Sequence, residues 1–144
     1  MSVTLDASVW LAAAMPGEPD HESARAVVDH LVKARESLEQ PTLFVVEVAG
    51  AVRRRSGSAQ QAADAVAQIA SLRTIRLHVL EGLLAESAAG IAGVLGLRAA
   101  DAVYLSTSVS AGATLITLDH ELRDRGSAVA AVVSPSEWLA STSR

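Results

Sequence analysis

Cysteine is absent from this sequence of 144 residues, and aromatic residues make up only 3% of it. Without cysteine the chain can form no disulfide, no thiolate metal site and no cysteine nucleophile, and it suits a reducing compartment such as the cytoplasm. The scarcity of aromatic rings excludes base stacking as the main way of holding a nucleic acid. We therefore expect Trp10 and Trp138 to lie in the core or at a dimer interface.

Long hydrophobic runs are also missing. The apolar stretch Val9–Met15 is too short to cross a bilayer, and no basic residue precedes it as one would in a signal peptide. We therefore expect a soluble, cytoplasmic protein that does not associate with a membrane.

Lysine is almost absent, since Lys33 is the only one and the other eleven basic residues are arginines. Receiver domains and haloacid-dehalogenase-type phosphatases also gather acids at strand ends, but both use a lysine that this chain does not supply. A nucleotide-binding switch would need a glycine-rich loop with a lysine, which is missing too. The net charge of −4 argues against a basic face for nucleic acid, unless several acids surround a divalent cation that reverses the local field.

The length of the chain fits one domain over residues 1–144, with a core that needs no covalent staples. Short β-type segments alternate with helical periodicity, which predicts a parallel sheet covered by helices on both faces. We expect strands at 3–5, 75–80, 114–117 and 129–133. We expect helices at 8–15 with Ser8 as the cap, at 20–37, between Pro41 and Gly57, at 58–72, 81–95 and 101–110, and from Pro135 onward.

Four carboxylates lie at the edges of these apolar elements. Asp6 and Asp119 follow predicted strands, and the carboxyl ends of parallel strands are where ligands bind. Glu47 lies within an apolar helical surface, and Asp101 begins a helix. Each acid alone has a plainer explanation: an ion pair between Glu47 and Arg54, a charge at a helix N-terminus, or a capping or turn residue. Capping and chance explain two such positions well and four poorly.

Carboxylates that lie close together repel each other, and a cation relieves that repulsion. Oxygen ligands alone suit the hard ions Mg²⁺ and Mn²⁺ rather than zinc. Such an ion lowers the pKa of a bound water and stabilises the charge that develops on a phosphodiester, so no nucleophilic side chain is needed. The four acids therefore favour metal-dependent hydrolysis of a phosphodiester.

Two segments of the C-terminal half resemble the PIN-domain family. They are the run from Gly96 to Leu105 (GLRAADAVYL) and the run from Gly112 to Asp119 (GATLITLD). The opening Leu5–Val9 and the central Glu47 complete the pattern of that family in order and spacing. The resemblance implies a PIN-like three-layer α/β sandwich with a central, mostly parallel sheet, and an endoribonuclease that requires Mg²⁺ or Mn²⁺. A bare domain of this length is most similar to the toxin of a VapBC-type toxin–antitoxin pair, which implies an RNA substrate, a VapB-type antitoxin and a homodimer.

Carried over by position, the resemblance assigns four catalytic and metal-binding residues, Asp6, Glu47, Asp101 and Asp119. The first and third acids of such families are the firmest ligands, so Asp6 and Asp101 rank highest.

Four further residues match supporting positions. Ser8 and Thr117 are small hydroxyl residues beside the acids, and a helix cap and an ordinary strand residue explain them equally well. Asp124 is a second candidate that replaces or supplements Asp119, although the arginines on either side of it favour an exposed turn. Arg54 either contacts a phosphate or belongs to a solvated helix end.

The alternative to a nuclease is a PIN-like binding module that keeps the fold and the acids without significant nuclease activity. Metal-dependent RNA cleavage by the wild type and by Asp101→Asn would separate the two hypotheses.

Overall fold

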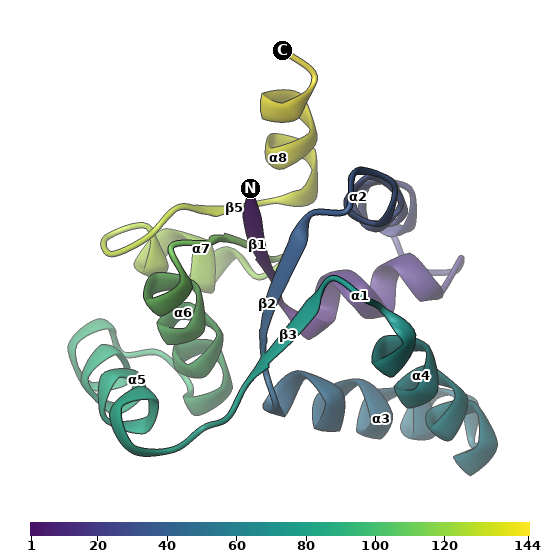
Figure 1. Cartoon of the computed structure of the whole chain (residues 1–144), viewed down its shortest axis with the longest axis horizontal. Coiled ribbons are helices and arrows are strands. Elements are labelled where there is room, and N and C mark those ends of the chain that lie inside the picture. Colours follow the sequence, from purple (N-terminus) through teal and green to yellow (C-terminus); the bar gives the residue numbers. More distant parts are fainter.

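The computed structural model describes residues 1–144 and shows a three-layer α/β sandwich (Figure 1). Its five strands form one parallel sheet in the order β3-β2-β1-β4-β5. The predicted fold class is thus confirmed, and the sheet is parallel throughout. The elements are β1 (Ser2–Leu5), α1 (Ala7–Ala14), α2 (His21–Ala34), β2 (Ser37–Pro41), α3 (Leu43–Ser56), α4 (Ala59–Ser71), β3 (Ile75–His78), α5 (Gly82–Leu95), α6 (Ala99–Ala111), β4 (Thr114–Ile116), α7 (His120–Gly126), β5 (Val132–Val133) and α8 (Pro135–Thr142).

The core lies on both faces of the central strands β1 and β4. Val3, Leu115 and Ile116 are fully buried, as expected for strands covered on both faces. Helices α5 and α6 lie on one side of the sheet and α1 to α4 on the other (Figure 1). Because α6 packs directly against β1, β2 and β4, the residues of its first turn lie beside the carboxyl ends of these strands.

Helix ends follow local rules at several places. Gly96 ends α5 and Gly112 ends α6, each with a positive φ (67° and 61°) that glycine adopts without strain. Ser58 caps α4 through a bond from the Gln61 N–H, and Ser134 forms a capping box with Glu137 at the start of α8. These boundaries match the predicted ones.

Strand β2 was not predicted, because its residues were assigned to the end of a helix over 20–37 and to a connection. The helix instead ends at Ala34, where Arg35 takes the left-handed conformation (φ 56°). The strand is hard to recognise because two of its buried residues, Glu39 and Gln40, are polar. Gln40 is satisfied by Leu5 of β1, whose N–H donates to Oε1 (2.8 Å) and whose carbonyl accepts from Nε2 (2.9 Å).

Three other expectations were wrong in detail. Ser8 does not cap α1, because the helix begins at Ala7 and Asp6 takes the N-cap position. Asp124 was expected in an exposed turn; it is exposed but lies on helix α7, whose N-terminus the Asp119 side chain caps. The last strand contains only Val132 and Val133.

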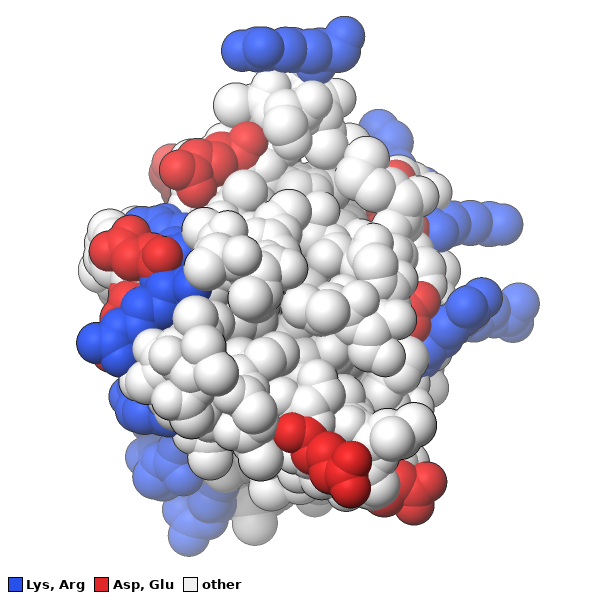
Figure 2. All heavy atoms as spheres, turned by 90° about the vertical axis from the view of Figure 1, so that its left-hand side faces the viewer, with Lys and Arg blue, Asp and Glu red and all other residues white.

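The face over α5 carries few charged side chains at its centre (Figure 2). Leu83 and Val94 of this helix are both 84% exposed. No single helix of the chain is long and apolar enough to span a membrane; only α5 and α6 taken together meet that length and composition, and they are bent by 117°.

Candidate active site

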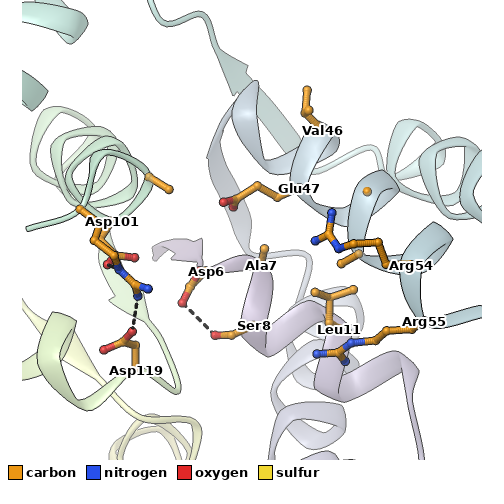
Figure 3. A pocket seen from close by; sticks show the side chains of 14 residues that line it. Asp6, Ala7, Ser8, Leu11, Val46, Glu47, Arg54, Arg55, Asp101 and Asp119 are labelled. Carbon is orange, nitrogen blue, oxygen red and sulfur yellow. Dashed lines mark hydrogen bonds and ion pairs between the residues drawn. The ribbon is translucent and has the colours of Figure 1, made fainter.

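One pocket at the carboxyl edge of the sheet brings together four acids that are distant in the sequence. Asp6 follows β1, and Asp119 follows β4, the strand paired with β1. Glu47 comes from α3 and Asp101 from the first turn of α6. All four line this pocket, and Figure 3 shows their side chains around its opening. The juxtaposition follows from parallel strands that end at the same edge.

Asp6 is held by neutral donors. Its Oδ2 accepts hydrogen bonds from the Ser8 hydroxyl (2.8 Å) and the Thr117 hydroxyl (2.7 Å). Asp6 is only 8% exposed. Its backbone N–H donates to the Ile116 carbonyl (3.0 Å), which ties the end of β1 to β4. Thr117 Oγ1 also accepts from the Asp119 N–H (3.0 Å). Thr117 and Ser8 therefore orient one carboxylate and leave its Oδ1 without a hydrogen-bond partner.

Glu47 is held by Tyr104, a residue of the Gly96–Leu105 run that was not predicted to belong to the site. The Tyr104 hydroxyl donates to Glu47 Oε2 at 2.5 Å, and Tyr104 is 1% exposed. Burial raises the pKa of Glu47, and repulsion by Asp6 and Asp101 adds to it, while the hydrogen bond from Tyr104 opposes the rise. The same surroundings raise the pKa of Tyr104, chiefly through burial, so its hydroxyl stays protonated and remains a donor. Glu47 makes no ion pair with Arg54, although that pair was one explanation of its position.

Asp101 and Asp119 share a single cationic partner, Arg98. Arg98 Nε donates to Asp101 Oδ2 (3.2 Å) and its terminal nitrogen donates to Asp119 Oδ2 (3.0 Å). Burial raises the pKa of Asp101, and repulsion by Asp6 and Asp119 adds to this, even though Arg98 works in the opposite direction. Asp119 Oδ1 accepts from the Leu122 N–H (3.0 Å), so the capping explanation holds for Asp119 while its other oxygen faces the pocket.

The supporting candidates divide into two groups. Ser8 and Arg54 line the pocket, and Thr117 lies beneath it, bonded to Asp6. Asp124 is exposed on α7 and does not line the pocket. Arg98 belongs to the run that carries the family resemblance, and its position three residues before Asp101 was the signal that could have drawn attention to it.

The donor set fits a hard divalent cation in kind. It consists of the oxygens of four carboxyl groups, and burial and repulsion raise the pKa of two of these groups, Glu47 and Asp101. The four side chains surround one pocket but do not form a closed cluster, since no group of three acids or histidines is arranged to hold an ion. Arg98 bridges two of the four acids, Asp101 and Asp119.

The family model of the PIN domain matches residues 3–127 of the chain. The chain belongs to the PIN-domain family. No curated protein sequence matches it significantly.

Several solved structures share this PIN fold. VapBC2 from Rickettsia felis, crystallised with a DNA fragment from its promoter, is 14% identical with a TM-score of 0.69, over 93% of this chain and 98% of that one. FitAcB from Neisseria gonorrhoeae is 20% identical with a TM-score of 0.70, over 93% and 98%. VapC20 from Mycobacterium tuberculosis, described as a toxin that cleaves the sarcin–ricin loop, is 20% identical with a TM-score of 0.68, over 86% and 95%. At these identities the likeness concerns the fold.

Proposed function

We propose that this PIN-domain chain is an endoribonuclease that depends on Mg²⁺ or Mn²⁺ and acts as the toxin of a VapBC-type toxin–antitoxin pair. The observation that carries the proposal is the convergence of Asp6, Glu47, Asp101 and Asp119 on one pocket from four separate elements. Support also comes from the family, whose nucleases generally use divalent metals. We further propose that residues 1–144 act as one PIN-like domain in the cytoplasm.

In this proposal the four acids would hold the cation, which when bound activates water and neutralises charge on the phosphodiester. The roles of the protein groups follow from their contacts. Ser8 and Thr117 hold Asp6 in one orientation through its Oδ2, which leaves Oδ1 free of hydrogen bonds. Tyr104 does the same for Glu47. Arg54 lines the opposite part of the pocket without an ion-pair partner, and in this proposal it would contact a substrate phosphate.

The proposed partners of this chain are an antitoxin, an RNA substrate and a second copy of the chain. The similar structures include toxin–antitoxin complexes, which supports a VapB-type antitoxin as the partner of this chain, and one is named for cleaving an RNA loop, which supports an RNA substrate. A homodimer is also part of the proposal, and the exposed apolar residues over α5 supply a surface that such a dimer could bury.

The decisive experiment measures cleavage of a structured RNA by the purified chain with Mn²⁺, with Mg²⁺ and with a chelator. Wild type should cleave only with metal, and Asp101→Asn should be slower by about a hundredfold or more, as for loss of one electrostatic group in an active site. Asp124→Asn is the matched control, because it makes the same chemical change at an acid outside the pocket.

Equal cleavage by Asp101→Asn and wild type would point to a contaminating nuclease and refute the proposal. Binding of RNA or of a partner without any metal-dependent cleavage would favour the binding module instead.

A further inference from the structure

The four acids of the pocket fall into two pairs with different kinds of partner. Asp6 and Glu47 accept hydrogen bonds from neutral hydroxyls, those of Ser8, Thr117 and Tyr104. Asp101 and Asp119 are instead bridged by a cation, since Arg98 contacts one oxygen of each. No other arginine forms an ion pair with any of these four acids. Arg55 at the pocket pairs with Glu18, and Arg54 has no ion-pair partner.

We propose that Arg98 is a built-in counter-cation that competes with the divalent metal for Asp101 and Asp119, and thereby sets the cation concentration at which the site is loaded. This inference rests on the proposed function only in assuming that the pocket binds a metal. It concerns a residue of this chain rather than the chemistry of cleavage.

Competition follows from the atoms involved. The oxygens that Arg98 contacts, Oδ2 of Asp101 and Oδ2 of Asp119, belong to the carboxylates that a cation in the pocket would use. A guanidinium remains charged at all physiological pH values, so it cannot give way by losing its proton. It also repels a dication a few ångströms away. For the metal to reach both carboxylates, Arg98 must therefore move.

The Arg98 side chain can move away from the two acids at a small cost in free energy. Its side chain is 73% exposed, and Arg98 lies at the N-cap of α6 with extended backbone (φ −64°, ψ 156°), so rotation of the side chain leaves the helix intact. Exposed ion pairs are individually weak, which means that a dication at sufficient concentration displaces them. By contrast, Asp6 is fixed by two hydroxyls and needs no such exchange. Asp6 and Glu47 are therefore already oriented by hydroxyl groups, whereas Asp101 and Asp119 are available to a metal only after Arg98 moves away.

The test is a titration of residues 1–144 with Mn²⁺ in the absence of RNA. Binding is measured by calorimetry and by the electron paramagnetic resonance signal of free Mn²⁺. Arg98→Gln should bind Mn²⁺ about tenfold more tightly than wild type, a difference of about 1.4 kcal/mol, because neither the competing bonds nor the adjacent charge remains. Arg98→Lys keeps the charge but cannot bridge both acids in the same way, so its affinity should lie between the two.

Arg53→Gln is the control for net charge, because it removes one positive charge from an exposed residue of α3 that does not line the pocket. Its Mn²⁺ affinity should stay within about twofold of wild type, since an exposed charge at a distance is screened by water and salt. Thermal unfolding in chelator measures how much the ion pairs of Arg98 stabilise the metal-free protein. Arg98→Gln should unfold at a lower temperature than wild type in chelator and at the same temperature in saturating Mn²⁺.

The possible outcomes are distinct. If wild type binds Mn²⁺ in a manner that depends on Asp101, and Arg98→Gln binds equally or more weakly, the competition is refuted while the proposed function survives. An equal gain in Arg53→Gln and Arg98→Gln would also refute it, because net charge would then explain the effect. If wild type binds no Mn²⁺, both this inference and the metal-dependent function are overturned.

Discussion

The hydrogen bond from Tyr104 to Glu47 permits a quantitative test of how the pocket is built. Tyr104→Phe removes one hydroxyl from a residue that is 1% exposed and leaves the ring in place, so it changes the core very little. What it removes is a 2.5 Å bond to a partly buried carboxylate. A hydrogen bond to a charged group contributes about 1.5–3 kcal/mol, and because water reaches part of Glu47 we take the lower end, about 1.5 kcal/mol.

The free energy of unfolding should therefore fall by about 1.5 kcal/mol in chelator near neutral pH, which lowers the melting temperature by roughly 5 °C for a chain of this size. Urea unfolding followed by circular dichroism measures this value. The pKa of Glu47 should also rise further in Tyr104→Phe, since the tyrosine hydroxyl is the contact that lowers it. Carboxyl NMR titration of the two proteins would show that change.

A double-mutant cycle with Glu47→Ala separates the hydrogen bond from other effects of the hydroxyl. The coupling free energy between the two substitutions should be about 1.5 kcal/mol, the value assigned to the bond. If Tyr104→Phe costs the same free energy with and without Glu47, the hydroxyl does not act through this carboxylate, and our account of how Glu47 is positioned is refuted.

Two further predictions concern pH. Because burial and repulsion raise the pKa of Glu47 and of Asp101, the folded, metal-free chain holds more protons than the unfolded chain between the ordinary and the raised values. Stability in chelator should therefore fall as pH increases through that window, and the double variant Glu47→Gln/Asp101→Asn should flatten the curve of melting temperature against pH; an unchanged slope would contradict the assignment. Glu39 behaves oppositely, since burial raises its pKa but the hydrogen bonds from Ser37 and His78 and the charges of His78 and Arg76 outweigh this and lower it. Its contribution is present above the ordinary carboxyl pKa and is lost as pH falls through the lowered value, so His78→Ala should move the midpoint of acid unfolding to higher pH, and a midpoint that does not move would rule out this pair as a source of acid stability.

Much of the fold could be predicted because its signals are local. The apolar strand after Gly112, the capped helix after Ser58 and the helix that carries Glu47 each show their own periodicity and end signals, and the structure has all three where they were expected. Strand β2 was not predicted because the contacts that stabilise it are not local in sequence. Its buried Gln40 is stable only because Leu5, 35 residues away in sequence, accepts and donates its hydrogen bonds, and no local pattern contains that information.

The candidate site likewise has one part that could be predicted from the sequence and one part that could not. The four acids could be proposed from the sequence because each stands beside an apolar element and all match the order of a known family pattern. Their roles as metal ligands remain a proposal, whereas the structure does show that they share one pocket. The arginines beside Asp124 indicated that it is exposed, but they did not indicate helix α7, which begins where the Asp119 side chain caps its first turn.

The amino-acid sequence by itself determined the residue types, the alternation of strands and helices, and the absence of cysteine or a late lysine that narrowed the chemistry. Tertiary structure alone decided the distant partners of the acids: Thr117 for Asp6 across 111 residues, Tyr104 for Glu47 across 57, and Arg98 for Asp119 across 21. The physical reason is that periodicity and capping act over a few residues, whereas the direction of a carboxylate and the sign of its neighbour depend on which strands pair and which helix packs over their ends.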